Sequence, residues 1–269
     1  MKLATTLLSA SLVYAASRSA TAAVTIYSST FEPPTYNVGA NDNLAGQDGW
    51  SINNPPLDPA LADLSFFYTY NIVADPGNNW GALGGRFVTP TVSPASLTHA
   101  AVLPLAYTSF SVELGISQNQ LPSITRDNFG WAFKSGGSNL LRVAFEPDPV
   151  VDPDPTKNQL DLVWYDSVGG RHDSGGRIYY DSIYRLKVDV SPSGSDASFV
   201  VTVVPGIGSS FVFNGTLTGQ GSANLDTVGA DFVPSGALDS AGDNTMYFDN
   251  LTVQLVPEAS SGLTLGLCA

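Results

Sequence analysis

The sequence predicts an all-β protein in which two antiparallel sheets pack face to face as a β-sandwich. Short runs of alternating apolar and polar residues recur along the chain; in Tyr107–Ile116, for example, Phe110, Val112 and Leu114 would share one face. Glycine and proline are plentiful, at 26 and 18 residues, as expected where many short strands are joined by turns. No helical periodicity longer than a turn or two follows residue 23. A jelly roll is the natural closure, because pairing the first strand with the last protects open edges.

The predicted strands are bounded by turn residues. The SGGS segment at 135–138 is a hairpin signal between two of them. Gly169–Gly176 is predicted to be a turn or a flexible lip, and Gly219–Asp243 could hold a short strand or a helical turn. The predicted strands are Val24–Glu32, Ser65–Ala74, Trp80–Thr89, Tyr107–Ile116, Asn128–Lys134, Asn139–Glu146, Leu160–Tyr165, Asp181–Val190, Ser198–Val204, Phe211–Thr218 and Thr245–Leu255.

Two connecting segments have distinct expected roles. In the glycine-rich block that ends at Trp50, we expect Leu44 and Trp50 to plug the edge of the core. Pro147–Pro155 is acidic and proline-rich, and because proline cannot donate to a strand ladder this segment is predicted to protrude as a loop.

The chain divides into three parts. Residues 1–23 are predicted to be a secretory signal peptide, with Lys2 at its start, an apolar run over Leu3–Ala16 and small residues before a cleavage site. Residues 24–255 are predicted to form one β-sandwich domain, and residues 256–269 a C-terminal tail. The expected location is therefore extracellular or at the cell surface.

The charge balance excludes one large class of function. The formal net charge is −13, and it becomes more negative when Lys2 and Arg18 leave with the signal peptide. No basic patch is available to neutralise phosphates, so we expect no nucleic-acid partner. Cys268 is the only cysteine, which excludes an intrachain disulfide, so stability must come from core burial with or without a metal.

Four segments carry a resemblance to a known fold family. They are Phe31-Glu32, the LAGQDGW block at 44–50, the hairpin YRLKVDVSPSGSDASFVVTV at 184–203 and the closing YFDNLTV at 247–253. Together they resemble the concanavalin A-like or laminin-G-like jelly rolls of bacterial exported proteins. The resemblance covers most of residues 24–255 and implies a jelly-roll fold.

The C-terminal tail resembles the sorting signal of PEP-CTERM proteins. The motif is Val256–Ser261, VPEASS, directly after the last predicted strand. In that family a Pro-Glu-Pro motif precedes a hydrophobic helix and a basic cluster, and exosortase-type processing follows. Here Ala259 replaces the second proline, and Gly262–Ala269 is too short to cross a bilayer, which needs about 20 helical residues. The resemblance implies exosortase-type sorting machinery as a partner.

One metal site is suggested by carboxylates that strand pairing would bring together. Glu32 ends the first predicted strand, Asp249 lies in the last, and Asp48 lies in the intervening loop. Ca²⁺ takes six to eight oxygen ligands and tolerates irregular loops, so a structural calcium ion is one hypothesis. The alternative is that these carboxylates only cap loop amides.

Carbohydrate binding is suggested by aromatic residues beside amides. Trp80, next to Asn78 and Asn79 in the DPGNN turn, is the best candidate for an exposed platform. Trp131 and Trp164 lie in alternating strands and are predicted to be core residues.

Catalytic groups are harder to assemble. Asp161 and Glu113 could face one groove as a glycosidase pair. Lyase chemistry could instead use Arg171 and His172 with Tyr180 or Tyr184. Both sets are equally well explained as strand and loop positions without chemistry, so no catalytic residue is assigned. The sequence therefore favours an exported, non-catalytic β-sandwich protein that binds glycans or belongs to an extracellular matrix; the alternative is a secreted polysaccharide-degrading enzyme on the same fold.

Overall fold

The computed structural model describes residues 22–32, 35–36, 44, 46–53, 65–69, 79–85, 94–117, 127–147, 159–233 and 244–257. These residues form strands and one short 3-10 helix. The strands are β1 (Val24–Ser29), β2 (Ser51–Asn53), β3 (Ser65–Thr69), β4 (Asn79–Gly85), β5 (Ala95–Pro104), β6 (Thr108–Ser117), β7 (Asn128–Ser135), β8 (Ser138–Pro147), β9 (Gln159–Tyr165), β10 (Arg171–Tyr179), β11 (Ile183–Ser193), β12 (Asp196–Pro205), β13 (Phe211–Leu217), β14 (Asn224–Val233) and β15 (Asn244–Leu255), and the helix η1 is Leu105–Tyr107.

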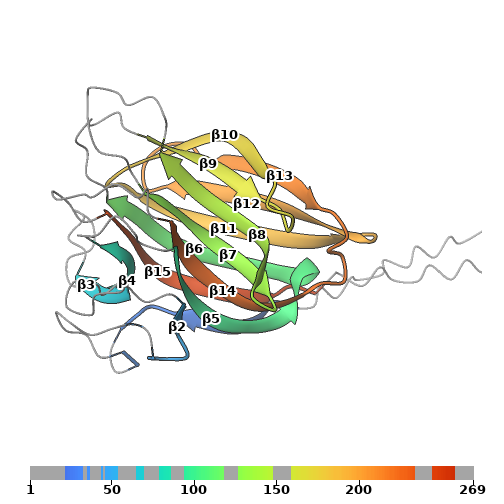
Figure 1. Ribbon diagram of the computed structural model, residues 1–269, viewed down its shortest axis with the longest axis horizontal. Helices are drawn as coiled ribbons and strands as arrows, with labels where there is room; N and C mark the ends of the chain where they lie inside the picture. Colours follow the sequence, from blue (N-terminus) through green and yellow to red (C-terminus); the bar gives the residue numbers. More distant parts are fainter. Residues whose placement is uncertain are drawn as a thin grey trace, which may run out of the picture.

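The strands form two layers, as predicted. An eight-stranded sheet has the order β13-β12-β11-β6-β15-β4-β3, with β1 also paired to β15, and a seven-stranded sheet has the order β10-β9-β8-β7-β14-β5-β2. Figure 1 shows the two curved sheets lying against each other. All of these pairs are antiparallel, which confirms the predicted two-sheet antiparallel β-sandwich.

The first and last strands pair, as expected for a jelly roll. The ladder between β1 and β15 runs from Val24 opposite Leu255 to Ser29 opposite Leu251. A bulge between Asp249 and Thr252 interrupts the pairing of β15 with β6. The chain therefore closes on itself at the strand that comes last in the sequence.

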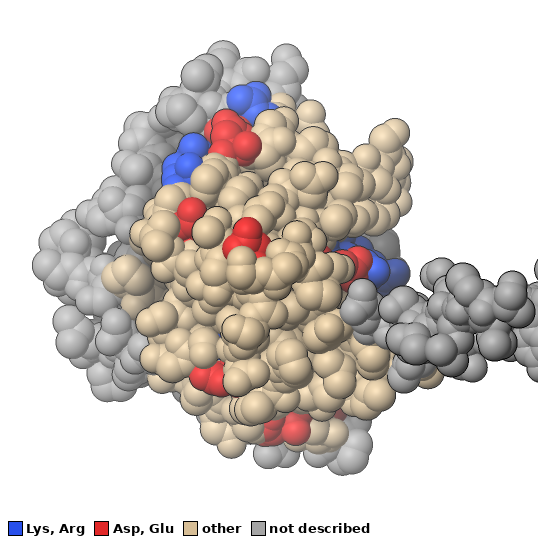
Figure 2. Space-filling view, turned by 90° about the vertical axis from the view of Figure 1, so that its right-hand side faces the viewer, with Lys and Arg blue, Asp and Glu red and all other residues tan. Residues whose placement is uncertain are grey.

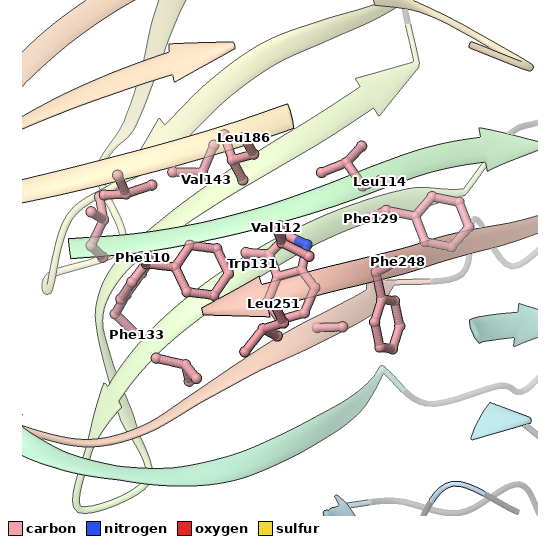
Figure 3. Packing of buried hydrophobic residues seen from close by; sticks show 14 of the residues in the cluster. Phe110, Val112, Leu114, Phe129, Trp131, Phe133, Val143, Leu186, Phe248 and Leu251 are labelled. Atoms are coloured by element: carbon pink, nitrogen blue, oxygen red, sulfur yellow. The ribbon is translucent and has the colours of Figure 1, made fainter. Parts of the chain in front are cut away.

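The core lies between the sheets and is rich in aromatic side chains. Trp131 packs against Phe110 and Phe248, with ring centroids 5.1 and 5.3 Å away (Figure 3). Trp131 and Trp164 are buried, as predicted. Leu44 and Trp50 are also buried in this core, so the expected plug from the glycine-rich block is confirmed.

The β7–β8 hairpin follows the prediction. Gly136 and Gly137 form its turn with φ of 54° and 82°, values that glycine adopts without strain and that suit the twist of a two-residue hairpin. Gly169–Gly176, in contrast, is not a lip: most of it belongs to β10, which pairs with β9. A bulge between Asp173 and Gly176 accommodates Gly175 and Gly176, whereas Gly169 and Gly170 lie in the turn that precedes β10, as predicted.

For one long strand of the seven-stranded sheet the sequence gives no prediction, and for a second it predicts only a short strand or a helical turn. They are β5 and β14, each of ten residues, and they pair with each other. Their small or polar residues, among them Gly229, Ala230 and Asp231, hide the period-two pattern. Burial of these positions comes from neighbouring strands, which a local sequence pattern does not reveal.

Some predictions fall on residues that the structure does not describe. They include residues 1–21 of the signal peptide, the loop at 148–155, Asn78 and the tail beyond residue 257. Among the described residues, no helix has the length and apolar character needed to span a membrane.

Replacement of Phe248 tests the packing of the closing strand. Phe248 is fully buried against Phe31, Trp50 and Trp131. We expect Phe248→Ala to lower the free energy of unfolding by about 3–5 kcal/mol, because it removes a large buried ring and leaves a cavity. Val102→Ala is the control, since Val102 is 73% exposed and its loss should change stability by less than about 0.5 kcal/mol. Urea unfolding followed by tryptophan fluorescence measures both, and equal stabilities for the two variants would contradict the packing.

Candidate functional site

The outer face of the seven-stranded sheet carries an open pocket of about 740 Å³. Residues from five strands line it, because the strands that carry them lie side by side in this sheet. The lining includes apolar residues and a set of polar side chains, namely Ser96, Asn128, Lys134, Arg142, Tyr165 and Asp231.

The pocket is hollow partly because small residues occupy the outer face of its floor. Gly130 of β7 lies opposite Asp231 of β14 and Ala144 of β8. A Cβ atom at Gly130 would stand 2.7 Å from the carbonyl oxygen of Val143 and 3.2 Å from Nε of Arg142. Glycine at this position therefore lets the Arg142 side chain cross β7 and reach Asp231.

A cluster of desolvated charges lies at the floor. Lys134 Nζ is 3.2 Å from Oδ1 of Asp231, and Arg142 Nε is 3.4 Å from Oδ2 of the same carboxylate. The exposed fractions of these side chains are only 14%, 9% and 11% for Lys134, Arg142 and Asp231. Ser96 Oγ donates a hydrogen bond to Asp231 and accepts one from Lys134. We call Ser96, Lys134, Arg142 and Asp231 the floor cluster.

Tyr165 forms one wall beside the floor cluster. Its ring centroid lies 5.5 Å from Cζ of Arg142, and its hydroxyl donates a hydrogen bond to Glu146. Glu146 also accepts a hydrogen bond of 2.9 Å from Nε of Arg171. Burial, and then the hydrogen bond to Glu146, raises the pKa of Tyr165 above its ordinary value, so the hydroxyl keeps its proton at neutral pH.

The rim beside Tyr165 is a tight turn held by Asp166. Its carboxylate accepts hydrogen bonds from the backbone amides of Val168 and Gly170, at 3.0 and 2.8 Å, and lies 3.1 Å from Nε2 of His172. The hydrogen bond with His172, followed by that with the amide of Gly170, lowers the pKa of Asp166 below its ordinary value. Asp166 is therefore ionised at neutral pH and already has its partners.

A second polar cluster fastens the N-terminal segments to the sandwich. Oδ2 of Asp48 accepts hydrogen bonds from the hydroxyls of Tyr27 and Tyr36, at 3.0 and 2.8 Å. Trp50 Nε1 donates to the Tyr27 hydroxyl at 3.0 Å, and the ring of His99 stacks on Tyr27 at 3.6 Å. We assign this cluster a structural role, because its groups bond to one another and hold the buried Trp50 in place.

The proposed calcium ligands are not assembled into one site. Among the described residues, no group of three His, Cys, Asp or Glu side chains could hold a metal ion. Glu32 lies past the end of β1, Asp48 accepts the two tyrosine hydroxyls, and Asp249 is fully buried in β15 opposite Glu113. The structure thus places all three residues but does not bring them together.

The proposed sugar platform is not exposed. Trp80 is only 1% exposed and packs with Ala82 and Tyr247 in a small cluster separate from the main core. The prediction that Trp80 presents an open aromatic surface is therefore wrong: its strand pairs with β15, and the side chain is covered rather than left beside a turn. Asn79 lies in β4, and Asn78 is outside the described residues.

The candidate catalytic sets do not converge either. Glu113 lies on the eight-stranded sheet with Arg185, whereas Asp161 lies on the seven-stranded sheet with Arg177, so they cannot share a groove.

The lyase set is divided in the same way. Arg171 bonds to Glu146 on the outer face, whereas His172 stacks on Trp164 at 3.8 Å. Tyr180 and Tyr184 are buried.

The floor cluster was missed from the sequence, although part of it had a signal. In the predicted β7–β8 hairpin, Lys134 and Arg142 occupy the polar positions of an alternating pattern, so both could have been placed on the outer face. Asp231 had no such signal, because the segment Gly219–Asp243 was predicted only to hold a short strand or a helical turn.

The surface charge of the described residues agrees with the acidic composition. On the face shown in Figure 2, acidic and basic side chains form small groups and most of the surface is uncharged. That face carries no extended basic patch among its described residues.

Comparison with solved structures confirms the concanavalin A-like jelly-roll fold. A marine PL-14 alginate lyase from Aplysia kurodai superposes with a TM-score of 0.55 at 10% identity, over 87% of this chain and 100% of that one. The CBM2 module of an evolved Dit protein from Lactobacillus casei BL23 phage J-1 gives a TM-score of 0.51 at 12% identity, over 87% of this chain and 96% of that module. No protein-family model matches the chain, and no curated protein does. At these identities the likeness establishes the fold alone.

The tyrosine cluster predicts a specific loss of stability in alkali. Burial raises the pKa of Tyr27 and of Tyr36 above the ordinary value of 10.0. In the unfolded chain tyrosines ionise near pH 10, whereas in the folded protein these two keep their protons. Their contribution to the free energy of unfolding is therefore complete below pH 10 and is lost as the pH rises further. The free energy of unfolding then falls by at most about 1.4 kcal/mol per pH unit for each tyrosine.

We therefore expect the double variant Tyr27→Phe, Tyr36→Phe to lose stability less steeply between about pH 10 and 11. Tyr179→Phe is the matched control, because Tyr179 is 46% exposed and outside the cluster. Urea unfolding at several pH values gives the slopes, and a double variant as steep as the parent protein would contradict the assignment.

Calcium binding by Glu32, Asp48 and Asp249 stays a prediction with a direct test. A bound ion would raise the melting midpoint in calcium relative to excess chelator, because a ligand held only by the native state stabilises it. Asp48→Asn should abolish that difference. Identical melting midpoints of the parent protein in the two buffers would contradict the calcium-site hypothesis.

Proposed function

We propose that this protein is an exported carbohydrate-binding β-sandwich that holds a polysaccharide in the pocket on the outer face of its seven-stranded sheet. The observation that carries the proposal is the pocket itself, which is open, of about 740 Å³ and lined by hydrogen-bonding side chains beside a tyrosine ring. Its volume falls within the range of about 300–1,000 Å³ typical of small-molecule sites.

The chemistry of the lining suits a sugar. A saccharide presents hydroxyl groups that both donate and accept hydrogen bonds, and Asn128 and Asn139 carry amides able to do the same. Tyr165 adds an aromatic ring against which the apolar face of a sugar could pack. The proposed ligand is therefore a chain of sugar units that lies across the sheet.

The comparisons support this class of ligand without identifying it. The structural neighbours described above are, by their names, a carbohydrate-binding module and an alginate lyase. By these names one is a binding module and the other an enzyme, and one fold can host both binding and catalysis.

The geometry favours binding over catalysis. A general base must be able to accept a proton, yet the pKa of Tyr165 is raised, so its hydroxyl acts as a donor. Asp231 lies between two cations, and Asp166 is held by its own turn. Neither carboxylate is thus placed as the protonated acid that glycoside hydrolysis requires. The rival function is a polysaccharide-degrading enzyme that uses the same pocket.

The proposal includes an extracellular or cell-surface location. It is supported by the predicted signal peptide at residues 1–23 and by the PEP-CTERM-like tail at 256–269, which would engage sorting machinery of the exosortase type. A role in an extracellular matrix would use the same sugar-binding face.

A binding panel tests the function. We expect the purified protein to be retarded in gels that contain at least one soluble polysaccharide. Tyr165→Ala should weaken binding by about tenfold and Asn139→Ala by about three- to tenfold, as expected for lost packing and one lost hydrogen bond.

Asn214→Ala is the control, because Asn214 is an exposed asparagine of β13 on the other sheet. A reducing-end assay on the same panel separates the rival functions. Release of new reducing ends by the parent protein would favour the enzyme, and the absence of any retardation would refute sugar binding.

A further inference from the structure

We propose that the pocket selects acidic saccharides and that the floor cluster receives their anionic group. This inference rests on the proposed function and narrows its ligand to sugars that carry a carboxylate or a sulfate. It depends on the balance of charges at the floor and on one hydrogen-bond donor of Arg142.

The floor cluster has one more positive charge than negative charges. Lys134 and Arg142 share the single carboxylate of Asp231, at 3.2 and 3.4 Å, and each of the three side chains is less than one-sixth exposed. A desolvated charge is costly unless it is paired. The surplus is therefore unusual in a protein whose formal net charge is −13.

Two further described carboxylates beside the floor cluster have partners of their own. Glu146 is bonded to Tyr165 and Arg171, and Asp166 is bonded to two backbone amides and to His172. They lie beside the floor cluster but form no ion pair with Lys134 or Arg142. An anion from outside the chain would balance the surplus of the floor cluster itself, with which Asp166, at the rim, forms no ion pair.

Arg142 supplies an independent observation. Its side chain is 9% exposed, and its Nη2 atom is buried without a hydrogen-bond partner. A buried donor that lacks an acceptor normally costs about 1–3 kcal/mol and calls for an explanation. The anionic group of a ligand is a strong acceptor and would supply the hydrogen-bond partner that Nη2 of Arg142 lacks.

The acidic surface does not oppose this selection strongly. Exposed charges farther away than the Debye length, about 8 Å at physiological ionic strength, are largely screened, whereas charges in a desolvated pocket are screened much less. Selectivity would therefore follow the local surplus at the floor cluster and not the net charge.

The experiment compares matched polymers on the full protein. One pair is a uronate polysaccharide and its carboxyl-reduced form; the other is a sulfated polysaccharide and its desulfated form. We expect the acidic member of at least one pair to bind ten times or more as tightly as its neutral form, and the pair that responds identifies the anionic group.

Lys134→Gln locates the effect, because it leaves Arg142 and Asp231 as a balanced pair. We expect the ratio of acidic to neutral affinity to fall by at least fivefold in this variant. Lys187→Gln is the matched control: Lys187 pairs with Asp189 on the other sheet, and its loss should leave the ratio unchanged. Melting curves verify that both variants are folded, and the comparison of polymers on the parent protein needs no variant.

The outcomes separate this inference from the proposed function. Equal affinity for both members of each pair overturns acid selection while sugar binding stands. A preference that survives Lys134→Gln, or that falls equally in Lys187→Gln, overturns the assignment to the floor cluster. Failure to bind any member of either pair, or any polysaccharide of the wider panel, overturns sugar binding itself.

Discussion

The architecture depends on the position of β15 between two sets of neighbours. One edge of this strand pairs with β6 along most of its length, while the other edge pairs first with β4 and then with β1. The bulge at Asp249–Thr252, with Asn250 in the left-handed region at φ of 50°, marks the change of neighbour. The last strand thus joins elements from the beginning and the middle of the chain. Because such contacts are distant in sequence, closure of the sandwich has to wait for the C-terminal strand.

Charged side chains are arranged differently on the two outer faces of the sandwich. On the eight-stranded sheet, charged residues such as Glu113 and Arg185 form exposed pairs that are worth little. On the seven-stranded sheet, Gly130 withholds a side chain, and the space lets Arg142 lie nearly buried beside Asp231. Burying the charges of Arg142 and Asp231 costs free energy, because they lose contact with water. These charges, and not the exposed pairs, are therefore the ones expected to influence ligand binding. Among the described residues, the core between the sheets is built mainly from apolar side chains, whereas the floor cluster lies on an outer face.

The fold was largely predictable from the sequence, and the site was not. Alternation identified strands such as Tyr107–Ile116, and the SGGS turn identified a hairpin, because these signals are local. β5 was missed, and β14 was predicted only as a short strand or a helical turn, because small and polar residues weaken their pattern. Trp80 was misjudged for the same kind of reason: the DPGNN turn suggested exposure, whereas tertiary packing covers the ring. Asp231 becomes a candidate only when strand order is known, since its partners come from β7 and β8.

The pairing of Val24 with Leu255 has a consequence for how the domain is presented. Both ends of the folded unit leave from neighbouring positions, and both belong to the eight-stranded sheet. The pocket belongs to the opposite layer. Anything joined to either end is therefore attached through a strand of the eight-stranded sheet, not through a strand that lines the pocket. A tether at either end would thus involve a different sheet from the one that carries the pocket.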